Sequence, residues 1–131
     1  MIAVDTSALM AVLLGEPEQD HIISLLERAD GVVISAGTLV ELRLVAYRRF
    51  GAPLAAEVDV SLGLFGIAII PVDREQADIA HTAFTRFGKG TGHPAQLNYG
   101  DLFAYALAKS RNIPLLFKGA DFVATDVIAA A

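Results

Sequence analysis

Acidic residues in this sequence recur beside short apolar segments, where a carboxylate is costly to bury unless a cation or a hydrogen-bond donor meets it. Four acids share such a position: Asp5 in "VDTSAL", Glu41 in "LVEL", Asp101 in "NYGDLFAYALA" and Asp121 in "LLFKGADF". Each also has a simpler explanation, as a helix cap, a helix start favoured by the dipole or a turn residue. If the fold gathers them, they would repel one another and take up protons. A hard divalent cation would stabilise such a cluster, and oxygen ligands alone favour Mg²⁺ or Mn²⁺.

Strands and helices alternate along the chain, and their arrangement decides whether these acids meet. Strands are predicted over residues 1–5, 32–35, 67–72 and 113–117, and helices over 7–14, 18–29, 37–50, 53–64, 74–87 and 98–111. Such alternation indicates βαβ units and a parallel sheet, and strands that are apolar throughout indicate helices on both faces. We therefore expect one α/β domain over residues 1–131, with about four to five short parallel strands. Ligands bind beyond the carboxyl ends of such strands, where Asp5 and Asp121 fall.

Local signals at three helices refine this prediction. Ser7 is the expected cap of the first helix, which would leave Asp5 free to face a cleft. Asn98 and Asp101 have the spacing of a capping box, with Asp in place of the usual Glu or Gln. The helix over 37–50 is expected to bury an apolar stripe. That stripe consists of Leu39, Leu42, Val45, Ala46 and Phe50.

Composition limits the class of protein. The chain has 131 residues, of which 54% are hydrophobic and 19% charged, so it can bury the core of one domain. No apolar run approaches the roughly 20 residues of a membrane span, and no basic region precedes the first apolar stretch. The absence of cysteine excludes disulfides and thiolate chemistry, which fits the cytoplasm. The net charge of −5 argues against a nucleic-acid partner, unless metal ions neutralise gathered acids.

The four acidic motifs resemble those of PIN-domain ribonucleases, and more closely those of the VapC toxins of bacterial type II toxin–antitoxin pairs. The resemblance covers essentially the whole chain. Its most specific parts are "LNYGDLFAYALAK" and "PLLFKGADFVATDV", and the "GKG" loop before them is also similar. It implies a PIN-like three-layer α/β/α fold and Mg²⁺- or Mn²⁺-dependent cleavage of structured RNA, either tRNA or rRNA. The implied products carry a 5′-phosphate and a 3′-hydroxyl, and the implied outcome is inhibition of translation.

By this resemblance, one or two metal ions would be held by Asp5, Glu41, Asp101 and Asp121. Thr6 and Ser7 would hydrogen-bond the ligand carboxylates, with helix capping as the alternative for both. Many PIN domains carry the fourth acid directly after the last strand, where this chain has Lys118 and Gly119. Asp126 is therefore the alternative to Asp121, or a support for the other acids.

The resemblance also implies partners. It implies a homodimer, an RNA substrate and a cognate VapB antitoxin that occupies the active-site groove, with DNA contacted only through that antitoxin. Candidate RNA contacts are Arg43, Lys89, His93 and Lys118, and beyond them Arg48, Arg49 and Arg86. A solvated surface charge is the alternative for each of them. The alternative function is a PIN-like module that binds RNA or a partner without cutting. A haloacid dehalogenase-type phosphatase would need an Asp where this chain has Ser7.

Overall fold

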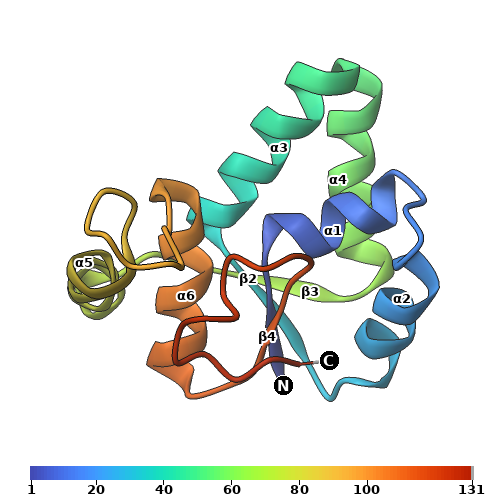
Figure 1. The fold of residues 1–131 in the computed structure, drawn as a ribbon. Helices are drawn as coiled ribbons and strands as arrows, with labels where there is room; N and C mark the ends of the chain where they lie inside the picture. The colour runs from blue at the N-terminus through green and yellow to red at the C-terminus, as the bar shows by residue number, and fades with distance from the viewer. Residues whose placement is uncertain (131) are drawn as a thin grey trace.

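A parallel sheet of four short strands forms the centre of the computed structural model, which describes residues 1–130 (Figure 1). The strands are β1 (Ile2–Val4), β2 (Val32–Ser35), β3 (Ile67–Ile70) and β4 (Leu115–Leu116). Their order is β3-β2-β1-β4, with Ala3 of β1 opposite Val33 on one side and Leu115 on the other. The expected parallel sheet of about four strands is confirmed, with shorter outer strands than the apolar runs suggested.

Helices cover both faces of this sheet, because consecutive strand residues point to opposite sides. The helices are α1 (Thr6–Leu13), α2 (Gln19–Arg28), α3 (Ala36–Phe50), α4 (Ala52–Leu64), α5 (Arg74–Phe87) and α6 (Tyr99–Arg111). On one face Val4, Ile34 and Leu116 pack with α1 to α4. On the other face Ala3 and Leu115 pack with α5 and α6. The three-layer α/β/α fold is therefore confirmed.

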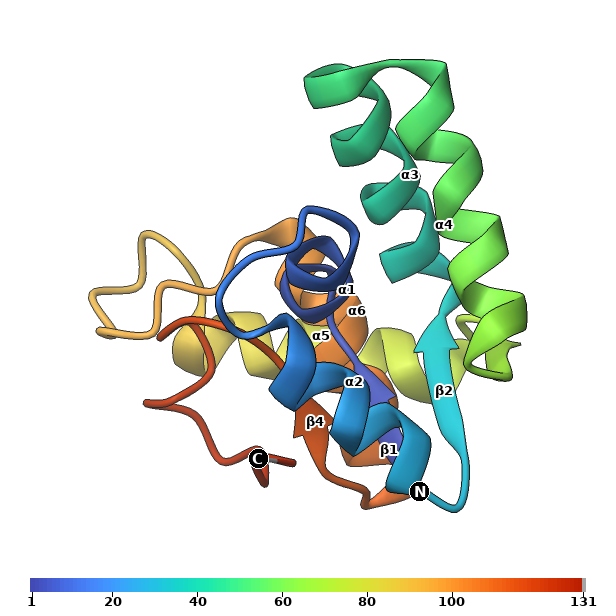
Figure 2. The ribbon, with the colours of Figure 1, turned by 90° about the vertical axis from the view of Figure 1, so that its right-hand side faces the viewer.

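The helices α3 and α4 lie side by side and extend together beyond the sheet (Figure 2). This corrects part of the predicted stripe of α3. The helix buries Thr38, Leu39, Leu42 and Ala46, whereas Phe50 at its end is 54% exposed. The reason is geometric, since the far end of α3 has α4 beside it but no sheet beneath it.

The strand order reverses between β1 and β4. β2 and then β3 lie on one side of β1, and β4, the last strand in the chain, lies on the other side of β1. This is the kind of switch point at which ligands bind in open α/β sheets. Asp5 follows β1 directly, so its carboxylate lies at that point. No helix within residues 1–130 is long and apolar enough to cross a membrane.

Candidate active site

Asp5 is fixed at the end of β1 by Ser7 and is 4% exposed. Its Oδ2 accepts hydrogen bonds from the backbone N–H of Ser7 at 3.1 Å and from the Ser7 hydroxyl at 2.7 Å. Asp5 is thus the cap of α1, and the prediction that Ser7 caps this helix is wrong. Ser7 lies inside the first turn instead, where its hydroxyl supports Asp5. The Ser7 Oγ also accepts the backbone N–H of Lys118 at 3.0 Å, which joins the first turn of α1 to the segment after β4.

The second carboxylate oxygen of Asp5 is unused. Among the described residues, the buried Oδ1 of Asp5 has no hydrogen-bond partner. Burial raises the pKa of Asp5; the hydrogen bonds of Ser7 oppose this shift, and the charge of Glu41 adds to it. An unpaired buried carboxylate oxygen is costly, so this atom is a natural position for a cation or its water.

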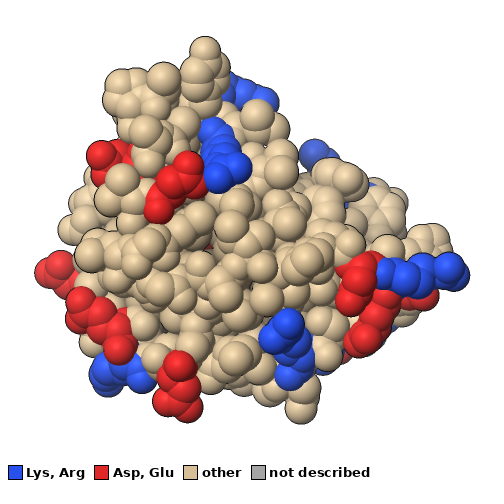
Figure 3. Space-filling model, turned by 180° about the vertical axis from the view of Figure 1, so that it is seen from behind, with Lys and Arg blue, Asp and Glu red and all other residues tan. Residues whose placement is uncertain are grey.

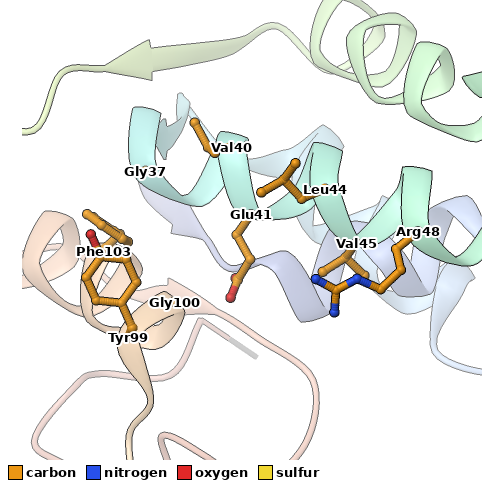
Figure 4. A pocket seen from close by; sticks show the side chains of 9 residues that line it. All are labelled: Gly37, Val40, Glu41, Leu44, Val45, Arg48, Tyr99, Gly100 and Phe103. Atoms are coloured by element: carbon orange, nitrogen blue, oxygen red, sulfur yellow. The ribbon is translucent and has the colours of Figure 1, made fainter.

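Glu41 reaches the same region from the second turn of α3. The hydroxyl of Thr6 donates a 2.5 Å hydrogen bond to Glu41 Oε1, which fixes the carboxylate against the start of α1. Figure 4 shows the Glu41 side chain directed from α3 toward Gly100 at the start of α6. Thr6 and Ser7 therefore each hold one acid, Thr6 holding Glu41 and Ser7 holding Asp5.

Asp101 lies in the first turn of α6 and forms the predicted capping box with Asn98. Its N–H donates to Asn98 Oδ1 at 3.0 Å, and its Oδ2 accepts the Asn98 N–H at 2.9 Å. The pKa of Asp101 is raised to about 7, mainly by burial and in addition by the charges of Asp5, Asp121 and Glu41, although the hydrogen bond from Asn98 lowers it. The charges of the three other candidate acids thus reach Asp101.

Asp121 and Asp126, the two candidates for the fourth acid, lie in different surroundings. Asp121 is exposed in the turns after β4, and its charge acts on Asp101. Asp126 accepts a 2.5 Å hydrogen bond from the Tyr105 hydroxyl and pairs with Lys109 and Arg86 at 3.3 Å and 3.6 Å. Burial alone would raise the pKa of Asp126, but the hydrogen bonds of Tyr105 and Lys109 lower it overall. Asp121 therefore lies within electrostatic reach of Asp101, whereas Asp126 is bound to α5 and α6.

The donors present fit a hydrated Mg²⁺ or Mn²⁺. Across residues 1–130, no three Asp, Glu, His or Cys side chains stand close enough together to hold a metal ion directly. Mg²⁺, however, keeps several of its waters and is bound through one or two carboxylates. The donor set is entirely carboxylate, Asp5 Oδ1 is unpaired, and the acids repel one another. Asp5 and Asp101 are the buried carboxylates that could hold such an ion.

The predicted RNA contacts are largely engaged within the chain. Arg43 pairs with Asp59 of α4 at 2.6 Å. The Lys118 ammonium pairs with Glu16 at 2.7 Å and Glu18 at 2.8 Å, and these partners raise the pKa of Lys118. Neither cation is therefore available without breaking an ion pair.

His93 and Lys89 lie in the loop between α5 and α6. His93 Nδ1 accepts the Ala95 N–H at 3.0 Å, and its ring meets Phe87 edge-on at 4.9 Å between centroids. His93 thus shapes the loop, whereas Lys89 is exposed. The face of the molecule in Figure 3 shows basic side chains scattered singly or beside acids, with no basic patch.

Two residues of this region were not predicted from the sequence. Gly100 lies against the Glu41 carboxylate, and Tyr105 holds Asp126. A glycine next to a capping-box acid was one available signal, because glycine is a poor helix residue. A tyrosine in a helix with a largely buried face was the other, because a buried phenol seeks a hydrogen-bond partner.

Comparison with known proteins agrees with this geometry. The PIN domain family model matches residues 2–128. The chain is 43% identical over 128 residues to Ribonuclease VapC of Mycolicibacterium smegmatis, covering 98% of both chains. It is 42% identical to Ribonuclease VapC42 of Mycobacterium tuberculosis, covering 95% of both. The chain therefore belongs to the PIN domain family and, within it, to the VapC ribonucleases.

Solved structures have the same fold at lower identity. VapC20 of Mycobacterium tuberculosis, described as a toxin that cleaves the sarcin–ricin loop, has a TM-score of 0.79 at 19% identity and covers 98% of this chain. VapBC2 of Rickettsia felis, solved with a promoter DNA fragment, has a TM-score of 0.77 at 17% identity and covers 98% of this chain. The match also covers 97% of the VapC20 chain and 96% of the VapBC2 chain, so the fold matches from end to end.

Proposed function

We propose that this chain is a Mg²⁺- or Mn²⁺-dependent endoribonuclease and the toxin of a VapBC toxin–antitoxin pair. The names of its relatives support the activity, and one structural observation supports the site. The pKa of Asp101 is raised to about 7 at a place where Asp5, Glu41 and Asp121 also exert their charge. Four mutually repelling acids at a strand switch point are explained by a cation that they share.

The acids have distinct roles in this proposal. Asp5, Glu41 and Asp101 would hold the ion, directly or through water, and Asp121 would complete the set. Bound there, a divalent ion supplies activation of a water molecule and neutralisation of charge on the scissile phosphate. Hydrolysis in which water adds to phosphorus and the bond to the 3′ oxygen breaks would leave a 5′-phosphate and a 3′-hydroxyl. Thr6 and Ser7 keep Glu41 and Asp5 in place through their hydroxyl groups.

The partners follow from the same relatives. We propose a structured RNA substrate, either tRNA or rRNA, a homodimer in the cytoplasm, and a VapB-type antitoxin that covers the site and alone contacts DNA. Among the four favoured RNA contacts, Lys89 is the exposed cation of the glycine-containing loop "GKGTG", whereas Arg43 and Lys118 are already paired. Lys89 is thus the first candidate for an RNA contact.

Substitution of Asp101 tests the proposal. Asp101→Asn keeps an oxygen that can accept the Asn98 N–H, so the capping box and the fold should survive. Cleavage of tRNA and rRNA with Mg²⁺ should fall by roughly a thousandfold, in the range seen when an essential electrostatic group is removed. Sequencing of RNA 5′ ends after induction would identify the substrate. Asp30→Asn, which neutralises an exposed acid before β2 at the opposite edge of the sheet, is the matched control and should cleave normally.

Two results would contradict the proposal. Wild-type cleavage by purified Asp101→Asn would remove the metal site from the mechanism. Absence of Mn²⁺ binding in calorimetry, together with absence of cleavage by the wild type, would favour the non-catalytic PIN-like module instead.

A further inference from the structure

Two glycines allow α3 and α6 to approach closely beside the acids. A Cβ added at Gly37 of α3 would run into the ring of Phe103 on α6, closer than real side chains approach. A Cβ added at Gly100 of α6 would run into the carboxylate of Glu41 on α3. Figure 4 shows both contacts on the wall of one pocket, with Glu41 above Gly100 and Phe103 beside Gly37.

The backbone of Gly100 does not itself require glycine. It lies in the first turn of α6, and it is not among the glycines with a positive φ. The three heavy atoms that an added Cβ would meet most closely all belong to the Glu41 carboxyl group. At this position the missing side chain thus leaves room for one functional group, the carboxylate of Glu41.

The missing side chain also has a cost. In a helix interior, glycine is about 1 kcal/mol less favourable than alanine, and in a first turn the difference is smaller. Stability alone would therefore favour alanine at position 100. A residue that lowers stability while making room for a candidate ligand is typical of functional sites.

We propose that Gly100 is a positioning residue, whose lack of a side chain allows Glu41 to hold its carboxylate at the N-terminus of α6 beside Asp101. This rests on the proposed function, because Glu41 is one of its metal-holding acids. Thr6 holds Oε1 of that carboxylate from one side, and Gly100 leaves space for Oε2 on the other. The partial positive charge of a helix N-terminus stabilises an anion placed there.

Gly100→Ala separates this role from a structural one. The atoms in the way are the far end of a flexible side chain, so Glu41 can swing aside while the backbone stays in place. We expect an unchanged or raised melting temperature in EDTA, roughly tenfold to a hundredfold weaker Mn²⁺ binding by calorimetry, and RNA cleavage reduced by about a hundredfold. Gly63→Ala in α4 is the matched control, since nothing lies within 4 Å of its added Cβ, and it should bind and cleave as the wild type does.

A second substitution tests the direction of the effect. Glu41→Asp shortens the side chain by one methylene and should impair the wild type. Combined with Gly100→Ala, it should restore Mn²⁺ binding above that of Gly100→Ala alone, because the shorter carboxylate clears the new methyl group. A general packing defect at position 100 would not be rescued in this way.

The outcomes separate this inference from the proposed function. If the wild type cleaves RNA and Gly100→Ala binds Mn²⁺ and cleaves equally well, Gly100 has no positioning role and the proposed function stands. A melting temperature lowered by several degrees in Gly100→Ala, without rescue by Glu41→Asp, would make Gly100 structural and overturn the inference. A wild type that neither binds Mn²⁺ nor cleaves RNA would overturn both.

Discussion

Asp101 has a structural role and is also a candidate for the chemistry. Its Oδ2 closes the capping box with Asn98, and the charges of three other acids act on its carboxyl group. The sequence predicted the capping box because its partners are three residues apart. It could not predict a pKa of about 7, because that value comes from burial and from acids distant in sequence.

The raised pKa of Asp101 predicts a pH dependence of stability in the metal-free protein. The pKa is about 7 in the folded state and near 3.8 in the unfolded chain, so the folded state binds more protons between these pH values. The free energy of unfolding should therefore fall as pH rises from about 4 to 7. Asp101→Asn should lack this loss. Its free energy of unfolding relative to the wild type should therefore rise by about 1–2 kcal/mol between pH 4 and pH 8, a fraction of the full shift at about 1.4 kcal/mol per pKa unit.

Urea unfolding in EDTA across this pH range measures the difference. Asp30→Asn provides the control for removal of an exposed acid. A stability difference between Asp101→Asn and the wild type that stays constant from pH 4 to pH 8 would contradict the assigned pKa. Added Mn²⁺ should stabilise the wild type above pH 7 more than it stabilises Asp101→Asn, since the ion replaces the lost proton.

At the scale of elements, periodicity and end signals predicted most helices and strands to within a few residues. The predicted helix over 74–87 matches α5, and Asn98, the predicted start of the last helix, caps α6. The errors occur where a tertiary contact decides. Ser7 was the better local cap for α1, yet β1 delivers Asp5 into that position and turns the Ser7 hydroxyl toward it. Phe50 continued the apolar pattern of α3 past the edge of the sheet.

The segment after β4 is attached to the helical layer by Asp126, which predicts a structural role for this acid. Tyr105→Phe removes the hydroxyl that donates to Asp126 Oδ1 and leaves Lys109 and Arg86 in place. We expect a loss of about 1–2 kcal/mol in the free energy of unfolding, typical of a lost hydrogen bond to a charged group. Cleavage at saturating Mg²⁺ should remain near that of the wild type.

Urea unfolding and RNA cleavage of the same Tyr105→Phe preparation test this assignment together. A large loss of cleavage with unchanged stability would instead make Asp126 part of the chemistry. Phe84→Leu, a change to an exposed ring on α5, serves as a control for a small aromatic truncation in the same layer.

At the scale of the whole molecule, the strand order decides what the sequence could not. Local patterns place an acid near the end of each relevant element, but only the order β3-β2-β1-β4 brings Asp5 and the segment carrying Asp121 to one edge. The resemblance to a family implied in advance that these acids share one site, whereas periodicity alone left that open. Gly100 was missed for the same reason, since its neighbour Glu41 is 59 positions earlier in the chain.

The net charge of −5 predicts weak electrostatic attraction of RNA. With Arg43 and Lys118 paired internally, few phosphates can be neutralised, and each neutralised phosphate steepens the dependence of binding on salt. We expect RNA binding by the inactive Asp101→Asn variant to show a log–log salt slope of only about −1 to −3. Lys89→Ala should make that slope shallower by about one.

Filter binding or fluorescence anisotropy checks this prediction. The salt concentration should be varied from roughly 50 to 200 mM, the range over which such slopes are measured. Arg74→Ala is the control, because Arg74 pairs with Asp78 on the far part of α5. A slope that is unchanged in Lys89→Ala would show that the loop between α5 and α6 does not contact the phosphate backbone.

The hydrogen bond between the backbone of Lys118 and the hydroxyl of Ser7 has a consequence for biosynthesis. It joins residues 111 positions apart, and β4 pairs with β1 over a similar separation. Chains emerge from the ribosome N-terminus first, so Asp5 and Glu41 are made long before Asp101 and Asp121 can join them. A partly synthesised chain therefore lacks the assembled acids. The four acids can come together only after β4 has left the ribosome and has paired with β1.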